Sequence, residues 1–189
     1  MLQDRLPQAQ KDAEQAIALQ EKLQIPVDVA TSRLTLAEVT LEQGHPADAL
    51  ALARKSSSEL AALKTDDRVA IADTTIARGL LALRRLDEAG TAIKRATGSP
   101  ATQASRQIRI NAVIAAARLK IASGDLAGAI IDLDKVLAEP APLALHLEAR
   151  LALAEARRSR AELRALEKEA RGKGFALIAR KAHNALEPH

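Results

Sequence analysis

The sequence predicts an all-α protein, a right-handed α-solenoid of antiparallel helix hairpins, on three observations. Of its 189 residues, 42 are Ala and 28 are Leu, a composition typical of helices and poor in the β-branched and aromatic residues of strands. No segment shows the alternation of apolar and polar residues that a half-buried strand requires. Small residues recur at an interval of 40 residues, and a constant interval of this size is typical of repeat architectures.

The forty-residue interval rests on alanines at two positions of each repeat. One lies in the middle of a predicted helix, with an apolar residue four positions later, and the other follows a predicted turn. Small side chains let two helix axes approach closely, so we expect these alanines to lie between packed helices. The recurring residues are Ala37, Ala77 and Ala117, then Leu41, Leu81 and Ile121, and finally Ala9, Ala49, Ala89 and Ala129.

Helix breakers and capping residues predict where each helix begins and ends. Gly44 and Gly124 suit the left-handed residue that follows a helix, and Asp125 and Ser159 can cap the helices after them. Prolines are tolerated in a first turn, and those near predicted helix starts are Pro26, Pro46, Pro100, Pro140 and Pro142. The predicted helices cover residues 5–23, 28–43, 46–63, 67–84, 86–97, 101–123, 125–138, 142–157, 159–172 and 174–186.

We expect a single helical repeat domain over residues 1–189. Its parts are a half repeat at 4–25, repeats at 28–64, 67–99 and 101–139, and a degenerate repeat with a C-terminal cap at 142–189. The first predicted helix has no preceding neighbour, so we expect its apolar face to contact a missing upstream domain or, as the alternative, a second copy in a homo-oligomer. That face comprises Leu6, Ala9, Ala13, Ala16 and Ile17.

Positive charge is concentrated near the end of the sequence. The net charge is +4, and residues 157–189 hold nine Lys and Arg against four Glu. Surfaces that bind single-stranded nucleic acid combine such charge with aromatic side chains on which bases stack, and Phe175 is the only aromatic residue. We therefore do not expect nucleic acid as a partner. We expect Phe175, with Leu177 and Ile178, to close the last helix hairpin.

No catalytic motif is evident. The sequence has no Cys, and its four His lack a second His or acid at the spacing of a metalloprotease helix. A glycine-rich phosphate loop and a nucleophile elbow are also missing. We expect no enzymatic activity, no cofactor and no metal. Since no apolar run approaches the roughly 18 residues of a membrane span, and no secretory signal is present, we expect a cytoplasmic protein that does not contact membranes.

One segment resembles a tetratricopeptide repeat. Residues 36–44 read Leu-Ala-Glu-Val-Thr-Leu-Glu-Gln-Gly and residues 46–50 read Pro-Ala-Asp-Ala-Leu, with the small mid-helix residue, the turn Gly and the later Ala of that family. Similar copies end at Ala89 and Ala129, so the resemblance spans residues 4–138. The forty-residue period exceeds the family's usual length of about 34. The family's large aromatics are replaced by Thr40, Leu80, Ala53, Ile93 and Leu133.

The last part of the chain has a second resemblance. Residues 149–155 and 166–182 resemble the C-terminus of large bacterial signalling proteins, in which such repeats follow a serine/threonine kinase or a winged-helix domain. Both resemblances imply a protein–protein interaction scaffold, a module of a larger bacterial signalling or regulatory protein. The alternative is a structural spacer or oligomerisation arm without a peptide ligand. Repeats of the HEAT type also run near forty residues, but the Gly-to-Ala turn pattern argues against them.

A solenoid of this kind would present the first helix of each pair to a concave groove. Arg78 and Arg118 occupy the same repeat position, so we expect them side by side at about 10 Å, the spacing of packed helices. Two guanidinium groups there could hold acidic side chains or the C-terminal carboxylate of a peptide. Equally, they could be solvated or paired with Glu38 and neighbouring acids. The candidate groove residues are Arg78, Arg118, Glu38, Thr74, Asn111 and Ile114.

Overall fold

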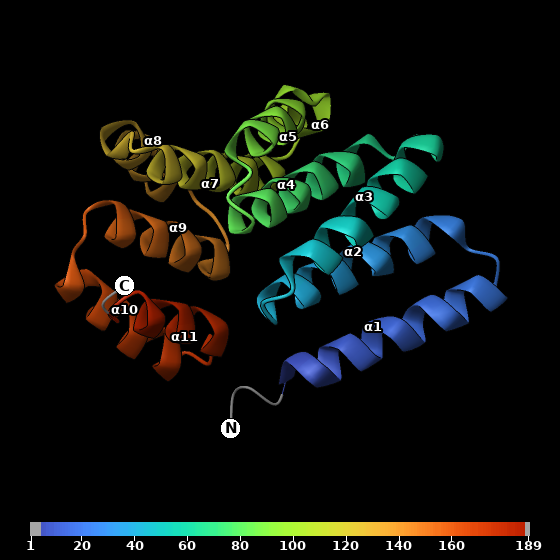
Figure 1. The fold of residues 1–189 in the computed structure, drawn as a ribbon, viewed down its shortest axis with the longest axis horizontal. Helices are drawn as coiled ribbons and strands as arrows, with labels where there is room; N and C mark the ends of the chain where they lie inside the picture. Colours follow the sequence, from blue (N-terminus) through green and yellow to red (C-terminus); the bar gives the residue numbers. More distant parts are fainter. Residues whose placement is uncertain (1–4, 188–189) are drawn as a thin grey trace. The chain divides into compact units, whose positions relative to one another are not determined.

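The computed structural model describes residues 5–187, and all the regular structure in that range is helical (Figure 1). The prediction of an all-α protein is therefore confirmed for these residues. The helices are α1 (Arg5–Lys22), α2 (Pro26–Glu42), α3 (Pro46–Ala62), α4 (Asp66–Ala82), α5 (Leu86–Gly98), α6 (Pro100–Ala104), α7 (Arg106–Ser123), α8 (Leu126–Leu137), α9 (Leu143–Ala156), α10 (Arg160–Gly172) and α11 (Ala176–Asn184).

The described residues group into two compact units, residues 5–112 and residues 113–187. The first unit contains α1 to α6 and the beginning of α7. The second unit contains the rest of α7 and the helices from α8 to α11. The sequence predicted one domain. It carries no signal for a boundary between residues 112 and 113, because α7 (Arg106–Ser123) runs through this position as a continuous helix without Gly or Pro.

Seven of the ten turns between the described helices contain a residue in the left-handed conformation. In the first unit these residues follow one another at twenty-residue steps, and Gly124 keeps the same register further along the chain. The amide after the left-handed residue donates to a carbonyl of the helix end, as from His45 N to Thr40 O at 3.1 Å, which satisfies the last carbonyls of the helix. The left-handed residues are Gln24, Gly44, Lys64, Arg84, Gly124, Arg158 and Gly174.

Predicted helix caps are confirmed at several helix starts. The Asp125 carboxylate accepts from the Gly128 amide at 2.9 Å, and the Ser159 hydroxyl accepts from the Glu162 amide at 3.3 Å. Prolines open three helices, where their missing N–H has no helical partner to lose. These are Pro26 in α2, Pro46 in α3 and Pro100 in α6.

The predicted helix over residues 101–123 is wrong, because it is two helices that meet at Ser105. Ser105 is extended, with φ −116° and ψ 113°, and its hydroxyl accepts from the Ile108 amide at 3.4 Å. It therefore caps the start of α7, as Ser residues commonly do. The buried Thr102 holds α6 in place by donating its hydroxyl to Ala96 O at 2.5 Å. Ser105 also lies twenty residues before the cap Asp125.

In the first unit each helix packs against the one before it. The helices α1 to α5 make successive contacts, α2 also contacts α4, and α6 lies against α4 and α5 (Figure 1). The recurring alanines are buried in these contacts: Ala37, Ala49, Ala77 and Ala89 are at most 2% exposed. Ala9 is only half-buried, although α1 packs against α2.

The apolar face expected on the first helix is only partly exposed. Ala13 is 7% exposed, and Leu6, Ala16 and Ile17 are half-buried, because this side of α1 packs against α2. The exposed apolar side chains of this region lie instead at the end of α1 and in the following turn.

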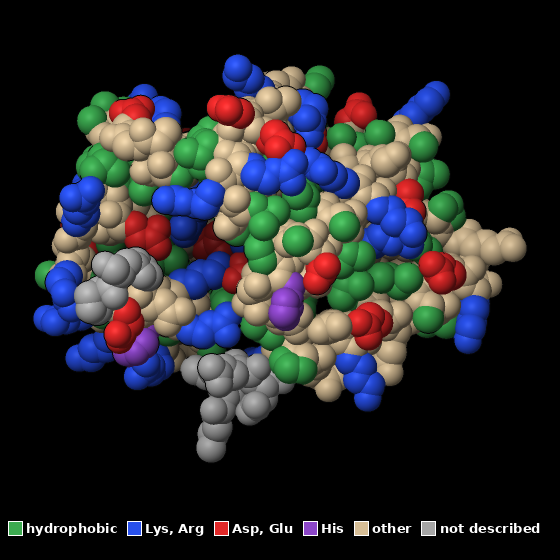
Figure 2. Space-filling view, viewed as in Figure 1, with side chains coloured by type: hydrophobic (Ala, Val, Ile, Leu, Met, Phe, Trp, Pro, Cys, Tyr) green, Lys and Arg blue, Asp and Glu red, His purple; other side chains and the backbone are tan. Residues whose placement is uncertain are grey.

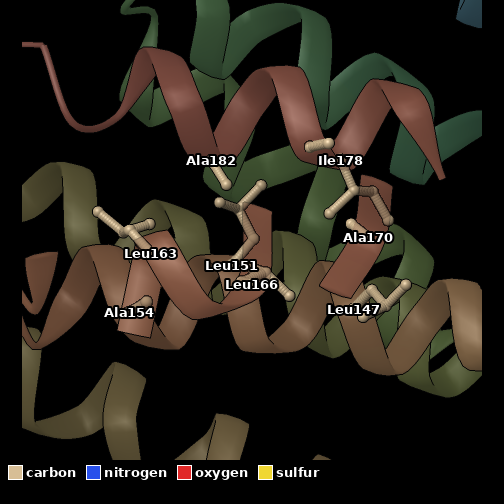
Figure 3. Close-up of a cluster of buried hydrophobic side chains, with 9 residues drawn as sticks. Leu147, Leu151, Ala154, Leu163, Leu166, Ala170, Ile178 and Ala182 are labelled. Carbon is tan, nitrogen blue, oxygen red and sulfur yellow. The ribbon is translucent and has the colours of Figure 1, made fainter. Parts of the chain in front are cut away.

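The second unit has a core between its last three helices (Figure 3). Leu163 and Leu166 of α10 lie between Leu151 of α9 and Ile178 of α11, and all four are at most 5% exposed. Phe175 packs against this cluster, so the prediction that the last hairpin is closed by Phe175, Leu177 and Ile178 is confirmed for Phe175 and Ile178. Leu177 is half-buried and is not part of the cluster. The recurring Ala117 and Ala129 are both fully buried.

Candidate functional site

The predicted groove residues of the first unit make contacts within the fold. Arg78 Nη2 donates to Glu42 Oε1 at 2.6 Å, which links α4 to α2. The two side chains are 26% and 12% exposed, so this ion pair is partly shielded from solvent. Glu38 of α2 accepts from the Thr75 hydroxyl of α4 at 3.2 Å. Both polar contacts hold α2 against α4.

The side chains of two further groove candidates donate hydrogen bonds within their own helices. Thr74 is 6% exposed, and its hydroxyl donates to Ala70 O of the same helix at 3.0 Å. Asn111 is half-buried and donates its amide to Gln107 O at 3.3 Å. The Thr74 hydroxyl is therefore not presented to a partner.

The predicted groove residues of the second unit are Arg118 and Ile114. Arg118 Nη1 of α7 donates to Glu155 Oε2 of α9 at 3.1 Å, and the two side chains are 29% and 28% exposed. Ile114 is buried, at 3% exposure. Like Arg78, Arg118 therefore forms an ion pair with a carboxylate from another helix of its own unit.

Arg78 and Arg118 belong to different units. The feature that they share is an intramolecular acid partner, Glu42 for Arg78 and Glu155 for Arg118. Of the two interpretations of these arginines, pairing with neighbouring acids matches the contacts. Their guanidinium groups retain partial exposure, but a ligand carboxylate would have to compete with a carboxylate already in place.

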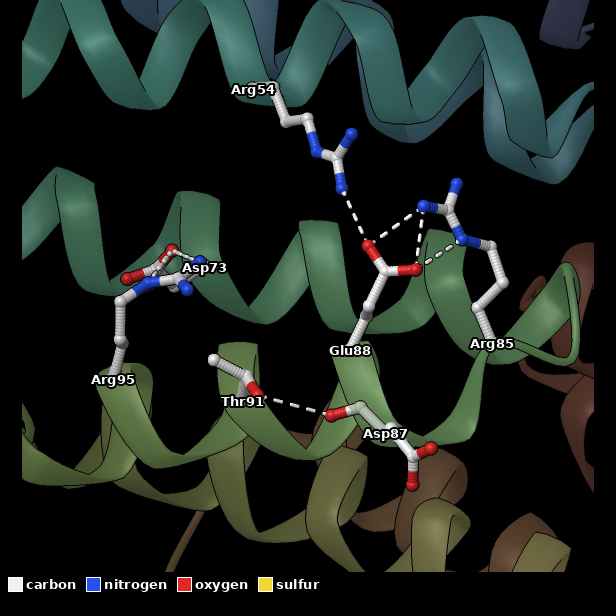
Figure 4. Close-up of polar contacts among 7 residues, drawn as sticks. All are labelled: Arg54, Asp73, Arg85, Asp87, Glu88, Thr91 and Arg95. Carbon is white, nitrogen blue, oxygen red and sulfur yellow. Dashed lines mark hydrogen bonds and ion pairs between the residues drawn. The ribbon is translucent and has the colours of Figure 1, made fainter.

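Two buried charges were not predicted from the sequence. Arg33 of α2 is 8% exposed and donates to Glu59 of α3. Asp73 of α4 is 5% exposed and accepts from Arg95 Nη2 of α5 at 2.7 Å (Figure 4). The hydrogen bond to Asp73 raises the pKa of Arg95. The available signal was that residues 33 and 73, at the same repeat position, are charged inside otherwise apolar helix faces.

An exposed charge cluster lies beside the Asp73 pair in the first unit (Figure 4). Glu88 of α5 accepts from Arg85 at 2.6 and 2.7 Å and from Arg54 of α3 at 3.3 Å. These contacts, chiefly the hydrogen bond from Arg85, lower the pKa of Glu88. Because all three side chains are exposed, we expect this cluster to contribute little to stability.

The exposed side of α10 carries a row of cations, and Lys and Arg side chains gather over the last helices in Figure 2. Arg160, Arg164, Lys168 and Arg171 succeed one another at three- or four-residue spacing and are exposed. Arg160 donates to Leu186 O at 3.0 Å, and Arg171 pairs with Glu167 at 2.6 Å. The lone aromatic of the sequence packs in the core instead of beside this row, so the row lacks an aromatic surface on which bases could stack.

The first unit has an open hollow at the α1–α2 turn. Its volume is about 560 Å³, and it lies between the end of α1, the first turn of α2 and the end of α3. Its lining residues are Glu21, Gln24, Ile25, Pro26, Val29, Glu59, Ala62 and Leu63. Ile25 is 39% exposed and the neighbouring Leu23 is 58% exposed. The sequence signal for this hollow was an apolar residue at a helix start, a position where polar side chains are preferred.

Within residues 5–187 we find no group of three or more His, Asp or Glu side chains placed to hold a metal ion. No helix of the same range combines the length and the apolar character that crossing a membrane requires.

These observations define a class of protein: an all-α chain whose short turns recur at a regular interval and whose buried charges join neighbouring helices. Comparison with protein-family models, with curated proteins and with solved structures found no match.

Proposed function

We propose that this chain is a protein–protein interaction module with the architecture of a tetratricopeptide-like α-solenoid. Support for the architecture comes from the left-handed residues that recur at twenty-residue steps from Gln24 to Arg84, which give two helices in each forty-residue unit. The burial of Ala37, Ala49, Ala77 and Ala89 supports it further, because small residues let successive hairpins pack closely.

The observation that carries the binding function is exposed apolar surface that the fold does not use. Leu19 on α1 and Leu23 in the turn after it are each 58% exposed, and Ile25 follows at 39%. Clustered apolar side chains on a surface usually mark a site of interaction with another macromolecule. The described charged residues with buried side chains, Arg33 and Asp73, are engaged in ion pairs between helices, which favours binding over catalysis as the role of this chain.

A wider setting follows from the resemblance of residues 149–155 and 166–182 to the ends of bacterial signalling proteins. We propose that the module works in the cytoplasm, within a larger bacterial signalling or regulatory protein, and brings a partner polypeptide to it without a cofactor. This part of the proposal rests on the resemblance of those two segments.

The test is capture of a partner by the purified full chain. We expect an immobilised chain to retain a protein from an extract of the organism that encodes it, and the purified partner to bind saturably. If the first helices form the binding groove, the double variant Arg78→Ala and Arg118→Ala should weaken binding at least about tenfold, or about 1.4 kcal/mol, while circular dichroism shows an intact fold.

The outcomes separate the parts of the proposal. Unchanged binding by the double variant would remove the groove as the binding surface but leave the module. A chain that retains no protein saturably would contradict the module itself.

A structural spacer or oligomerisation arm is the second candidate, and one observation favours it. Arg78 and Arg118 are both committed to carboxylates of their own unit, as expected if polar side chains serve only the fold. Light scattering after size-exclusion chromatography distinguishes the two functions, because an oligomerisation arm should give a mass that rises with protein concentration.

A further inference from the structure

Exposed apolar side chains are concentrated at one turn of the first unit. Among the described residues, five large apolar side chains are exposed, and three of them lie within seven residues of one another. These three are Leu19, Leu23 and Ile25. The turn joins the end of α1 to the start of α2 (Figure 1).

The hollow at this turn has an apolar wall; we refer to it as the turn hollow. Its volume of about 560 Å³ is in the range of sites that accept a small molecule or several side chains. The apolar lining residues are Ile25, Pro26, Val29, Ala62 and Leu63. They come from the α1–α2 turn, from α2 and from the end of α3, so packing of the first three helices shapes the hollow.

The charged residues that line the turn hollow are both glutamates. Glu21 and Glu59 have side chains that are 57% and 35% exposed. Arg33 contacts both carboxylates, but its own side chain is only 9% exposed. One buried guanidinium offsets one of the two negative charges, so the charge presented to solvent is negative. An occupant with a positive group next to an apolar one would complement this surface.

Ile25 breaks a local rule of helix formation at this place. It is the residue before α2, and it makes no side-chain capping hydrogen bond. Ser, Thr, Asp and Asn are preferred there because they can accept from the first amides of the helix, as Asp125 and Ser159 do in this chain. Ile25 therefore leaves the helix uncapped, as His45 does at the start of α3, and in addition it exposes apolar surface.

We propose that the turn hollow binds a segment of a partner polypeptide that presents an apolar side chain next to a lysine or arginine. The apolar side chain contacts Ile25, Val29 and Leu63, and the cation lies against Glu21 and Glu59. This assignment rests on the proposed protein-binding function and specifies the chemistry of the partner.

The test compares two serine substitutions at equivalent positions. Ile25 precedes Pro26 of α2, and His45 precedes Pro46 of α3, and neither makes a capping hydrogen bond. Both Ile25→Ser and His45→Ser introduce a favourable cap, so both should keep or raise the melting temperature. Only Ile25→Ser removes part of the apolar wall, because His45 does not line the turn hollow.

The probe is a short amphipathic peptide built only of leucine and lysine, labelled for fluorescence anisotropy with the full chain. We expect Ile25→Ser to weaken its binding about tenfold and His45→Ser to leave it unchanged. Wild-type affinity in Ile25→Ser, or equal weakening in both variants, would overturn the assignment.

The charge requirement is tested separately. Glu21→Gln should weaken binding of the same peptide severalfold, whereas Glu14→Gln, at an exposed position of the same helix, should not. Glu59 is left unchanged because it pairs with the buried Arg33. The same peptide with glutamate at every lysine should bind more weakly than the lysine peptide. Equal binding of the two peptides would contradict the proposed cation.

Two outcomes separate this assignment from its alternatives. A concentration-dependent dimer in the wild type that becomes a monomer in Ile25→Ser would identify a second copy as the occupant and overturn the partner assignment. If Ile25→Ser binds the peptide normally and the chain still captures a partner saturably, the turn hollow is excluded while the protein-binding function stands. Peptide binding that depends on Ile25, without any captured partner, would contradict that function alone.

Discussion

Arg33 and Asp73 occupy the same position of α2 and α4, forty residues apart, and each is a buried charge paired with the helix that follows it. Arg33 donates to Glu59 of α3, whereas Asp73 accepts from Arg95 of α5 at 2.7 Å. The sign of the charges is thus exchanged between the two helix pairs. If the partners were exchanged, so that Arg33 faced Arg95 or Asp73 faced Glu59, like charges would meet beside a buried group, at a cost in free energy. The exchange therefore favours the correct pairing of otherwise similar helices.

The Asp73–Arg95 pair predicts an asymmetric response to mutation. Arg95→Ala leaves a carboxylate that is 5% exposed without its partner and should lower the free energy of unfolding by about 2 kcal/mol. Asp73→Asn leaves Arg95, whose side chain is 51% exposed, free to be solvated and should cost less than about 1 kcal/mol. Urea unfolding measures both values. Equal costs, or the reverse order, would show that this pair does not control stability as described.

The left-handed turn residues predict that introducing glycine at one position stabilises the fold and that removing glycine at another destabilises it. Lys64 has φ 55°, which strains a residue with a Cβ, so Lys64→Gly should raise the free energy of unfolding by about 0.5–1 kcal/mol. Gly44→Ala should lower it by about 1 kcal/mol. No atom lies within 4 Å of a Cβ added at Gly44, so the loss would come from backbone strain and not from a clash. Thermal or urea unfolding checks the two signs, and a stabilised Gly44→Ala would refute the assignment.

The buried alanines predict intolerance of larger side chains. Ala77 of α4 is fully buried, and Ala77→Leu should overpack its contacts and lower the free energy of unfolding by about 1–3 kcal/mol. Ala51→Leu on α3 is the control, because Ala51 is exposed and leucine is also a good helix former. Comparable stability of the two variants in urea would mean that the close approach of helices at Ala77 is not required.

The hydrogen bonds of Glu169 predict that the free energy of unfolding falls at acid pH. Hydrogen bonds from Lys173 and then Arg150 lower its pKa from the usual 4.5. Since the folded-state pKa is the lower one, the stabilisation is present above about pH 4.5 and is lost as the pH falls through the folded-state value. We expect Lys173→Ala to raise the pKa of Glu169 more than Arg150→Ala does in an NMR titration of the carboxyl group. The reverse order would make Arg150 the dominant partner.

Helix ends were the most predictable feature of the structure. Gly44 and Gly124 are left-handed as predicted, and Asp125 and Ser159 cap their helices. Ser105 was missed although it belongs to the same class of signal, because the predicted helix over 101–123 was drawn through it. The left-handed conformation of Lys64 and Arg84 was also missed, because Lys and Arg side chains do not favour that conformation.

The candidate site was less predictable, because exposure depends on neighbours. Arg78 lies on α4 and Arg118 on α7, but their partners Glu42 and Glu155 come from other helices. Thr74 was expected in an open groove and is buried. Ala13 of α1 is buried, whereas Leu19 of the same helix and Leu23 of the following turn are exposed.

The sequence by itself determined the helical class, the positions of most turns and the burial of the recurring alanines at Ala37 and Ala77. These depend on interactions over a few residues, such as a cap, a proline or a left-handed glycine, and on a periodicity visible in one chain. Only the tertiary structure decided that Arg33 would be buried against Glu59 and that Ile25 would border an open hollow. The reason is that ion pairing and solvent exposure depend on side chains far apart in the sequence, which the packing of whole helices brings together.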